Sequence, residues 1–416
     1  MNILKFFTAG SVDDGKSTLI GRLLYDTNSI LADQLEALQQ SNRKNDDGTI
    51  DLAILTDGLR AEREQGITID VAYKYFQTDK RKFIIADTPG HIQYTRNMIT
   101  GASTAKLAII LIDARNGVIE QTIRHSYLVS LLGVEHVVVC LNKMDMVDYS
   151  ESVFTEIVNT YKTLAKDLDL KDVTFIPVSA LRGDNIVNES EHMPWYTGRS
   201  LLHFLETVEV DNGEASALAR MPVQWVIRPQ TEALHDYRGY AGRVVSGEFK
   251  VNDAVTVLPS GSSSTIDRIE IFDQTPETVY AGQSVTLHLK DNIDISRGDV
   301  LVNSAHLPKT SQLIEADLCW MDMRPLDDSI TYLLQHNSKV TKCKIREIVY
   351  KVDINTLEKQ EAYDFKLNDI GRVVLKTADE LAFDLYTDNK ANGAAILIDS
   401  RTNLTVAALM FRSVAD

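Results

Sequence analysis

The sequence predicts an α/β domain at its amino end, followed by two all-β barrels. In the first half of the 416 residues, short apolar strands alternate with longer helical patterns, which indicates a parallel sheet covered by helices. In the second half, short strands rich in Val, Ile and Thr are separated by turn residues, a pattern typical of β-barrels. We expect an α/β domain at 1–208, a linker at 209–221, and barrels at 222–308 and 309–416.

Five apolar segments of the first domain have the length of buried strands: 3–9, 82–86, 107–113, 137–142 and 175–178. Helical patterns at 17–25, 121–132 and 152–167 lie between them. Ligands of such α/β folds bind at the carboxyl ends of the strands. We therefore expect the functional residues in the loops that follow these strands.

Composition and charge argue against several classes of protein. The sequence is 44% hydrophobic and 25% charged, as is ordinary for a soluble globular protein, and no apolar run is long enough for a membrane span. The net charge of −16 argues against nucleic-acid binding through bulk charge. Cys140, Cys319 and Cys343 are widely spaced, and the first residues lack a signal-peptide pattern. We expect a cytoplasmic protein with no membrane partner and no disulfides, in which Cys140 is a small buried hydrophobe.

A phosphate-binding motif follows the first strand. The pattern GxxxxGK[ST], with the next residue, is formed without a gap by Gly10, Ser11, Val12, Asp13, Asp14, Gly15, Lys16, Ser17 and Thr18. It lies between a strand and a helix, where its glycines and the helix start can turn N–H groups toward phosphate oxygens. We expect Lys16 to bridge the β- and γ-phosphates and the Ser17 hydroxyl to ligate Mg²⁺. A chance glycine-rich turn is the alternative.

A base-recognition motif, NKxD, follows the strand at 137–142, and it consists of Asn142, Lys143, Met144 and Asp145. The Asp145 carboxylate can accept hydrogen bonds from guanine N1–H and the guanine 2-amino group, whereas adenine has no donor at either place. We expect Asn142 to connect this loop to the phosphate loop, and the aliphatic part of Lys143 to cover the base. A solvated turn is the alternative interpretation.

The strand at 175–178 is followed directly by Ser179, Ala180 and Leu181. Their backbone N–H groups can be offered to the guanine oxygen. These three residues alone would not indicate a guanine contact. Their position in the chain, after the other motifs, favours that interpretation.

The strand at 82–86 is followed directly by Asp87, Thr88, Pro89, Gly90 and His91. Asp87 can hold Mg²⁺ through a water molecule, and the Gly90 amide can reach the γ-phosphate, so that hydrolysis would release the segment that follows. His91 comes directly after this glycine, and it can orient the attacking water. The alternative for His91 is a partly exposed residue at a helix start. The other eight histidines form no metal-type cluster, and we interpret them as surface or packing residues.

A long polar connection, including residues 41–48, precedes this strand, and long connections in compact domains are usually functional or disordered. Within it, residues 63–70 read REQGITID. Thr68 is the candidate for the second hydroxyl ligand of Mg²⁺, with an ordinary strand residue as the alternative.

These motifs together resemble the translational GTPases, elongation factor Tu above all. The chain is more closely similar to the GTPase subunits of bacterial sulfate adenylyltransferase (ATP sulfurylase), over essentially its whole length. Ser11 and Asp14 stand where Tu-type factors carry histidines. The residues that carry this similarity lie at 6–14, 21–27, 56–59, 70–73, 93–98, 193–198, 201–202, 238–242 and 367–371.

The resemblance implies a P-loop GTPase domain with two barrels, the cofactors GTP or GDP and Mg²⁺, and a monovalent cation near Asp13. It also implies that a small partner subunit binds ATP and sulfate and makes adenylyl sulfate, and that GTP hydrolysis in this chain supports that uphill reaction. The single P-loop of the sequence agrees with this division of labour.

Two other functions share these motifs. A translation factor that delivers aminoacyl-tRNA has the same fold and the same GTP motifs, but it needs a basic RNA surface. A regulatory switch that binds GTP with negligible turnover is the second alternative. The presence of His91, together with the intact motifs at 63–70 and 87–91, argues against it.

Overall fold

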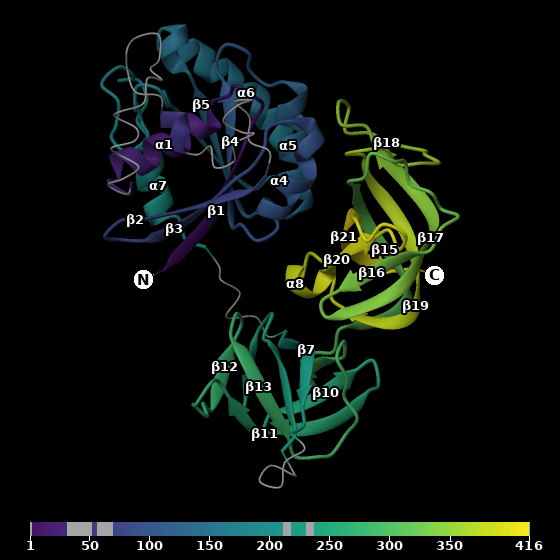
Figure 1. Ribbon diagram of the computed structural model, residues 1–416. Helices are drawn as coiled ribbons and strands as arrows, with labels where there is room; N and C mark the ends of the chain where they lie inside the picture. The colour runs from purple at the N-terminus through teal and green to yellow at the C-terminus, as the bar shows by residue number, and fades with distance from the viewer. Residues whose placement is uncertain (1, 31–51, 56–69, 211–217, 230–236, 416) are drawn as a thin grey trace. The chain divides into compact units, whose positions relative to one another are not determined.

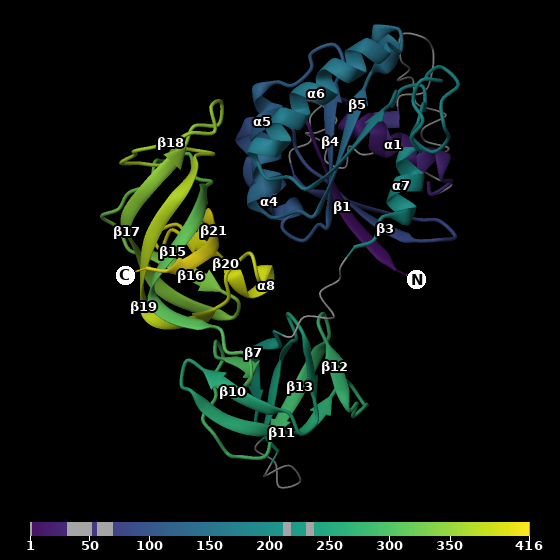
Figure 2. The same ribbon diagram turned by 180° about the vertical axis from the view of Figure 1, so that it is seen from behind.

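The computed structural model describes residues 2–30, 52–55, 70–210, 218–229 and 237–415 (Figure 1). The chain separates into two compact units, with the division after Val210. The first unit holds the α/β domain and the second holds two barrels (Figure 2). Thr68, the connection at 41–48 and most of the predicted linker lie outside the described residues.

A six-stranded sheet with the order β2-β3-β1-β4-β5-β6 forms the centre of the first unit. Its strands are β1 (Ile3–Ala9), β2 (Ala72–Gln77), β3 (Lys82–Asp87), β4 (Leu107–Asp113), β5 (His136–Asn142) and β6 (Asp172–Pro177). The five expected strands are present and parallel. The expectation of a wholly parallel sheet is wrong at one edge, where β2 is antiparallel to β3. The reason is the short connection between them, because a tight turn can join only antiparallel neighbours.

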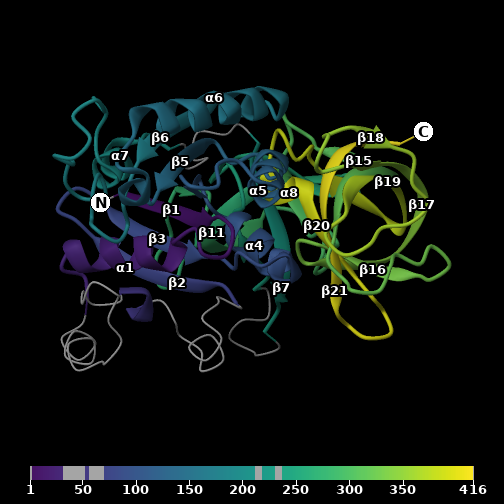
Figure 3. The ribbon, with the colours of Figure 1, turned by 90° about the horizontal axis from the view of Figure 1, so that it is seen from above.

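Helices cover both faces of this sheet. They are α1 (Lys16–Asp26), α4 (Thr95–Ala102), α5 (Glu120–Leu131), α6 (Glu151–Asp167) and α7 (Leu201–Thr207), with short 3₁₀ turns η1 (Leu52–Leu55), η2 (Ile92–Tyr94) and η3 (Met144–Val147). Helices α1 and α7 lie on one face, and α4, α5 and α6 lie on the other (Figures 1 and 3). All seven residues of β4 are buried because the strand is covered on both faces.

The core on the α1 side is a continuous apolar cluster. Leu19, Ile20 and Leu23 of α1 pack with Leu4 and Phe6 of β1 in this cluster, and all five are fully buried. Burying side chains of this size stabilises the fold by about 1.5–3 kcal/mol each. This packing fixes α1, and with it the loop that precedes α1, at the carboxyl end of β1.

The second unit contains a first closed barrel of six strands in the order β10-β11-β13-β8-β7-β14. Its strands are β7 (Arg220–Ile227), β8 (Gly239–Arg243), β10 (Ala254–Leu258), β11 (Ser262–Glu270), β13 (Ser284–Leu289) and β14 (Val300–Asn303). Strands β9 (Glu248–Lys250) and β12 (Thr278–Tyr280) form a separate pair.

The following strands have the order β16-β20-β21-β15-β19-β17, and the pairing of β16 with β17 closes them into a second barrel. Its strands are β15 (Lys309–Trp320), β16 (Tyr332–His336), β17 (Lys339–Val352), β19 (Ile370–Phe383), β20 (Ala394–Ile398) and β21 (Thr405–Val414), with β18 (Lys359–Gln360) beside β17 and the short helix α8 (Lys390–Gly393) before β20. The predicted fold class, an α/β domain followed by two all-β barrels, is therefore confirmed.

A buried polar cluster joins the two barrels. Arg220 of the first barrel is fully buried, and it donates two hydrogen bonds of 2.9 Å to the carboxylate of Asp384 in the second barrel. The side-chain amides of Asn389 and Asn392 donate to the same carboxylate at 3.1 and 3.0 Å. Since every partner of the carboxylate is a donor, the buried charges are compensated, and we infer that this network stabilises one mutual arrangement of the barrels.

Candidate functional site

The phosphate loop connects β1 to α1 through backbone that ordinary residues rarely adopt. Gly10, Asp13 and Gly15 have φ values of 157°, 68° and 90°. Such backbone turns successive N–H groups to one side, the arrangement that binds phosphate. Gly15 meets a second constraint, because a Cβ at this position would lie 2.4 Å from Nδ2 of Asn142. Only glycine therefore fits between the loop and that side chain.

Asp14 closes the loop from within. Its carboxylate is buried and accepts a hydrogen bond from the backbone N–H of Ser11 at 2.5 Å. Burial raises the pKa of Asp14, while the hydrogen bond from Ser11 and the charge of Lys16 oppose that rise. The aspartate that stands in place of a Tu-type histidine thus has a local role in holding the loop.

Lys16 is the first residue of α1, and its side chain is 7% exposed. Its Nζ donates to the backbone oxygens of Gly10 at 2.9 Å and Ser11 at 2.8 Å. Burial lowers the pKa of Lys16, and the charges of Asp87 and Asp14 oppose this change. The ammonium group lies inside the loop, and a phosphate would offer it oxygens in place of the two carbonyls.

Asn142, at the end of β5, connects the loops of the site. Its Nδ2 donates to the backbone oxygen of Asp14 at 2.7 Å, and its Oδ1 accepts from the N–H of Ala180 at 2.9 Å. The side chain is 2% exposed. The expected connection between the base-recognition loop and the phosphate loop is therefore present, and it extends to the loop after β6.

Asp145 has the feature that guanine recognition requires. Its Oδ1 is buried and has no hydrogen-bond partner among the residues that the structure describes. A buried carboxylate oxygen without a donor is costly, so the position suits a ligand that supplies N–H groups. The residues present therefore fit a guanine base.

Lys143 is held across the site by an aspartate that the sequence patterns did not single out. Its Nζ lies 3.0 Å from Oδ2 of Asp113, the last residue of β4, and Arg115 pairs with the same carboxylate. Burial alone would raise the pKa of Asp113, but hydrogen bonds from Arg115 and Lys143 lower it to about 2. Asp113 ends an apolar strand, and only the spatial neighbourhood reveals its role.

The loop after β6 is tied to its surroundings through its backbone. The N–H of Ser179 donates to the oxygen of Asp184 at 3.2 Å, and the N–H of Ala180 donates to Asn142. Arg22 of α1 donates to the carbonyl oxygens of Ala180 at 3.3 Å and Leu181 at 2.5 Å. Two of the three amides expected to serve guanine thus have partners within the protein, and a base would exchange or share those bonds.

An aromatic loop supports both base-recognition segments. Trp195 donates through Nε1 to the backbone oxygen of Tyr149 at 2.9 Å, just after η3. The hydroxyl of Tyr149 donates to Asp184 at 3.1 Å, and its ring stacks on His192 with a centroid separation of 4.8 Å. Residues 193–198 carry part of the family resemblance. In the structure, Trp195 of this segment holds the chain after η3 in place through the Tyr149 backbone oxygen.

The segment after β3 packs directly on the phosphate loop. Asp87 is fully buried and accepts a hydrogen bond from the Thr8 hydroxyl at 3.3 Å, and the Thr88 hydroxyl donates to the Thr8 backbone oxygen at 2.5 Å. A Cβ on Gly90 would lie 2.5 Å from Nζ of Lys16 and 2.7 Å from the backbone oxygen of Gly10, so glycine is required by close approach. The charge of Asp87 also acts on Lys16, so the two side chains lie near each other, as a shared phosphate and Mg²⁺ site requires.

His91 follows Pro89 and Gly90 and immediately precedes the η2 turn. It is half-buried, and its ring meets the edge of Tyr94 at a centroid distance of 6.3 Å.

Among the three candidate Mg²⁺ ligands, Ser17 and Asp87 lie within the residues that the structure describes, and Thr68 lies outside them.

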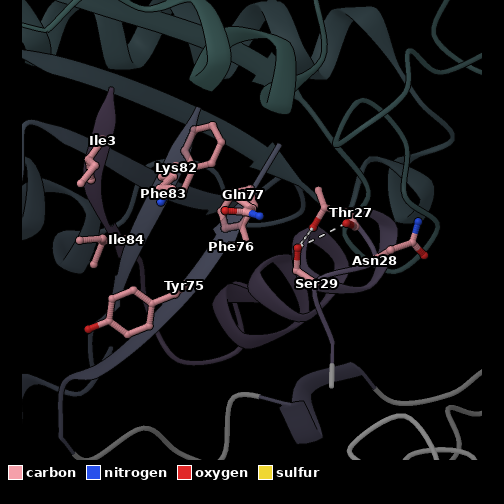
Figure 4. A pocket seen from close by; sticks show the side chains of 10 residues that line it. All are labelled: Ile3, Thr27, Asn28, Ser29, Tyr75, Phe76, Gln77, Lys82, Phe83 and Ile84. Atoms are coloured by element: carbon pink, nitrogen blue, oxygen red, sulfur yellow. Dashed lines mark hydrogen bonds between the residues drawn. The ribbon is translucent and has the colours of Figure 1, made fainter. Parts of the chain in front are cut away.

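A hollow of about 650 Å³ lies at the opposite end of the sheet (Figure 4). Ile3 and Lys82, the first residues of β1 and β3, line it, so it is at the amino ends of these parallel strands. Its other lining side chains include Thr27 and Ser29, whose hydroxyls are 3.0 Å apart, and it contains none of the predicted site residues.

No helix in the described part of the chain is long and apolar enough to cross a membrane. Cys140, Cys319 and Cys343 are all buried thiols outside any disulfide, and the interpretation of Cys140 as a buried hydrophobe is confirmed.

Two family models match the chain. The model described as the elongation factor Tu GTP binding domain matches residues 1–227, more than half of the sequence. The model described as GTP-eEF1A C-terminal domain-like matches residues 313–412, within the second barrel.

Many curated relatives match the chain, and the three described next, each named sulfate adenylyltransferase subunit 1, match over nearly its full length. The protein of Bacteroides fragilis (strain YCH46) is 54% identical, with 98% of this chain and 86% of the relative covered. The protein of Aliarcobacter butzleri (strain RM4018) is 51% identical, with 100% and 88% covered. The protein of Teredinibacter turnerae (strain ATCC 39867 / T7901) is 53% identical, with 98% and 87% covered.

Proposed function

Because the chain belongs to the family of sulfate adenylyltransferase subunit 1 and carries an elongation factor Tu GTP binding domain, we propose that it couples GTP hydrolysis to the formation of adenylyl sulfate. A small catalytic subunit would bind ATP and sulfate and carry out the adenylyl transfer. The observation that carries the GTP part of this proposal is the pair of Asn142 hydrogen bonds, which join the phosphate loop to the loops after β5 and β6. The loop after β5 holds the buried Asp145 oxygen that has no hydrogen-bond partner among the described residues.

The phosphates would be bound by residues 10–18, with Lys16 exchanging the carbonyls of Gly10 and Ser11 for phosphate oxygens. Mg²⁺ supplies positive charge that neutralises the charge developing on the phosphates. We assign Ser17, Thr68 and Asp87 as the residues that hold it. A monovalent cation near Asp13 belongs to the same proposal. The base would be bound by Asn142, Lys143, Met144, Asp145, Ser179, Ala180 and Leu181.

The catalytic step depends mainly on positioning and charge. His91 would orient the attacking water, Lys16 would balance the charge that develops on the γ-phosphate, and the Gly90 amide would donate to the same group. Gly90 supports this assignment because it lies against Lys16 with no space for a side chain.

Coupling to the partner follows from differential affinity. Adenylyl sulfate formation is strongly uphill, because a phosphate–sulfate anhydride is a high-energy bond. GTP would order two segments, the one that contains Thr68 and the one that follows Gly90. The ordered surface would bind the partner, and hydrolysis would release it. Equal affinity of the partner for the GTP and GDP forms would contradict this mechanism.

We further propose the domains 1–208, 222–308 and 309–416, a linker at 209–221 whose last two residues already belong to strand β7, and a cytoplasmic location. The three buried cysteines, which form no disulfide, support a reducing compartment. The net charge of −16 supports a protein partner over a nucleic acid.

The test is the GTP hydrolysis rate of the chain mixed with the small subunit of its own source, with and without ATP and sulfate. Stimulation that requires both substrates supports the proposal. Stimulation by ribosomes and aminoacyl-tRNA instead would move the chain to translation. Tight GTP binding with negligible turnover under both conditions would favour the regulatory switch.

A further inference from the structure

Helix α5 contacts the segment after β3 through one side chain. Gln121, in the first turn of α5, donates from Nε2 to the backbone oxygen of Gly90 at 3.3 Å. The same Nε2 lies 3.0 Å from Nε2 of His125, one helical turn further along. Since an amide NH₂ has two hydrogens, one Gln121 side chain can serve both acceptors.

The Gly90 carbonyl determines the rest of this arrangement. The amide of Gln121 must turn its NH₂ toward that oxygen, because the opposite orientation would place two oxygens against each other. His125 Nε2 must then accept, which puts the proton of the neutral imidazole on Nδ1, a buried atom with no hydrogen-bond partner among the described residues. Burial, together with the charges of Lys16 and Arg124, lowers the pKa of His125 to about 3, so the ring is neutral near pH 7.

The helix that carries this pair is firmly anchored. His125 is 2% exposed, and the next residue, Ser126, exchanges a 2.8 Å hydrogen bond with the hydroxyl of Tyr161 on α6. The Thr122 hydroxyl accepts the N–H of Ile119 at the helix start. The pair therefore offers Gly90 a contact point whose position is set by the core.

Gly90 needs such a contact. Close approach of the phosphate-loop backbone at Gly10 requires glycine here, and glycine leaves the backbone free to rotate. The oxygen that Gln121 holds belongs to the peptide unit that joins Gly90 to His91. Holding this unit fixes ψ of Gly90 and limits φ of His91, and thereby the direction in which the imidazole of His91 projects.

We propose that Gln121 and His125 are positioning residues for GTP hydrolysis, which act by holding the Gly90–His91 peptide unit so that His91 points at the attacking water. This inference rests on the proposed role of His91. The contact supports catalysis and contributes little to nucleotide affinity, because neither side chain belongs to the segments that bind the phosphates or the base.

Single-turnover GTP hydrolysis by the full chain tests the pair. Gln121→Leu removes both donors, and His125→Leu removes the acceptor at similar volume. Each is expected to slow hydrolysis by about tenfold or more, since misplaced proton-transfer and water-orienting groups lose factors of this size, while GTP and GDP affinities change by less than about threefold. His125→Gln restores an acceptor and is expected to recover most of the rate. Glu120→Gln, an exposed change on the same helix turn, is the matched control.

The decisive measurement is a double-mutant cycle with His91→Ala. If the pair acts through His91, Gln121→Leu adds no further loss in the His91→Ala background. Full additivity, or a fall in affinity equal to the fall in rate, would overturn the inference. Gln121 is only half-buried, so the Gln121 arm stands even if the buried His125 variants do not fold. The cycle uses GTP alone, so a failure of stimulation by ATP and sulfate would count against the proposed function and leave this result unaffected.

Discussion

Asn142 and Asp14 are joined by a buried 2.7 Å hydrogen bond between loops 128 residues apart in the sequence. The same Asn142 side chain accepts the N–H of Ala180. The segments proposed to bind the base and the phosphates are thus parts of one hydrogen-bonded unit. A change at Asn142 should affect the binding of the whole nucleotide.

Asn142→Ala removes both hydrogen bonds and leaves the Asp14 backbone oxygen and the Ala180 N–H buried without a hydrogen-bond partner. Each unpaired group costs about 1–3 kcal/mol of stability. We expect GTP and GDP affinities to fall together by about 100-fold. Asn142→Asp keeps an acceptor for Ala180 but sets a buried carboxylate oxygen against the Asp14 carbonyl oxygen, so its effect should be at least as large. Titration calorimetry with both nucleotides measures this, and an unchanged GDP affinity would refute the bridging role.

Gly15→Ala places a Cβ 2.4 Å from the Asn142 side chain, at a φ of 90°. We expect nucleotide binding to be lost, because the loop and Asn142 cannot both keep their positions. Gly261→Ala is the matched control, since Gly261 has φ 76° but nothing within 4 Å of a Cβ. The control should cost only the backbone strain of about 1–2 kcal/mol in unfolding free energy and leave GDP affinity intact.

Lys16→Ala and His91→Ala should separate binding from catalysis. The lysine variant should nearly abolish GTP binding, because the phosphates lose their buried cation. The histidine variant should keep GTP affinity and slow single-turnover hydrolysis by about 100-fold or more. Unchanged turnover in His91→Ala would remove His91 from the mechanism.

Asp145→Asn should shift nucleotide preference from GTP toward xanthosine triphosphate. The variant replaces a carboxylate oxygen by an NH₂ donor, which matches the 2-oxo group of xanthine. The discrimination between the two bases rests on pairing of buried polar groups, which can reach about 10⁴-fold. Competition binding with both triphosphates checks this, and an unaltered preference for guanine would contradict the role of Asp145.

Arg220→Met leaves the Asp384 carboxylate buried without its charged partner, which costs about 3–5 kcal/mol. We expect the calorimetric unfolding transition of the barrels to move to lower temperature. The double variant Arg220→Met with Asp384→Leu should recover part of this loss, because no lone charge remains. A single variant as stable as the wild type would show that the pair does not hold the barrels together.

The sequence by itself determined the class of the fold, the phosphate loop, the base motif and the chemistry that they imply. These features are local, because a glycine pattern specifies its own backbone and a buried parallel strand is apolar along its length. The antiparallel β2, the role of Asp113 toward Lys143, the Gln121–Gly90 contact and the Arg220–Asp384 pair were decided only by the tertiary structure. Each joins residues through packing, and no short pattern records which polar side chain the core places opposite another.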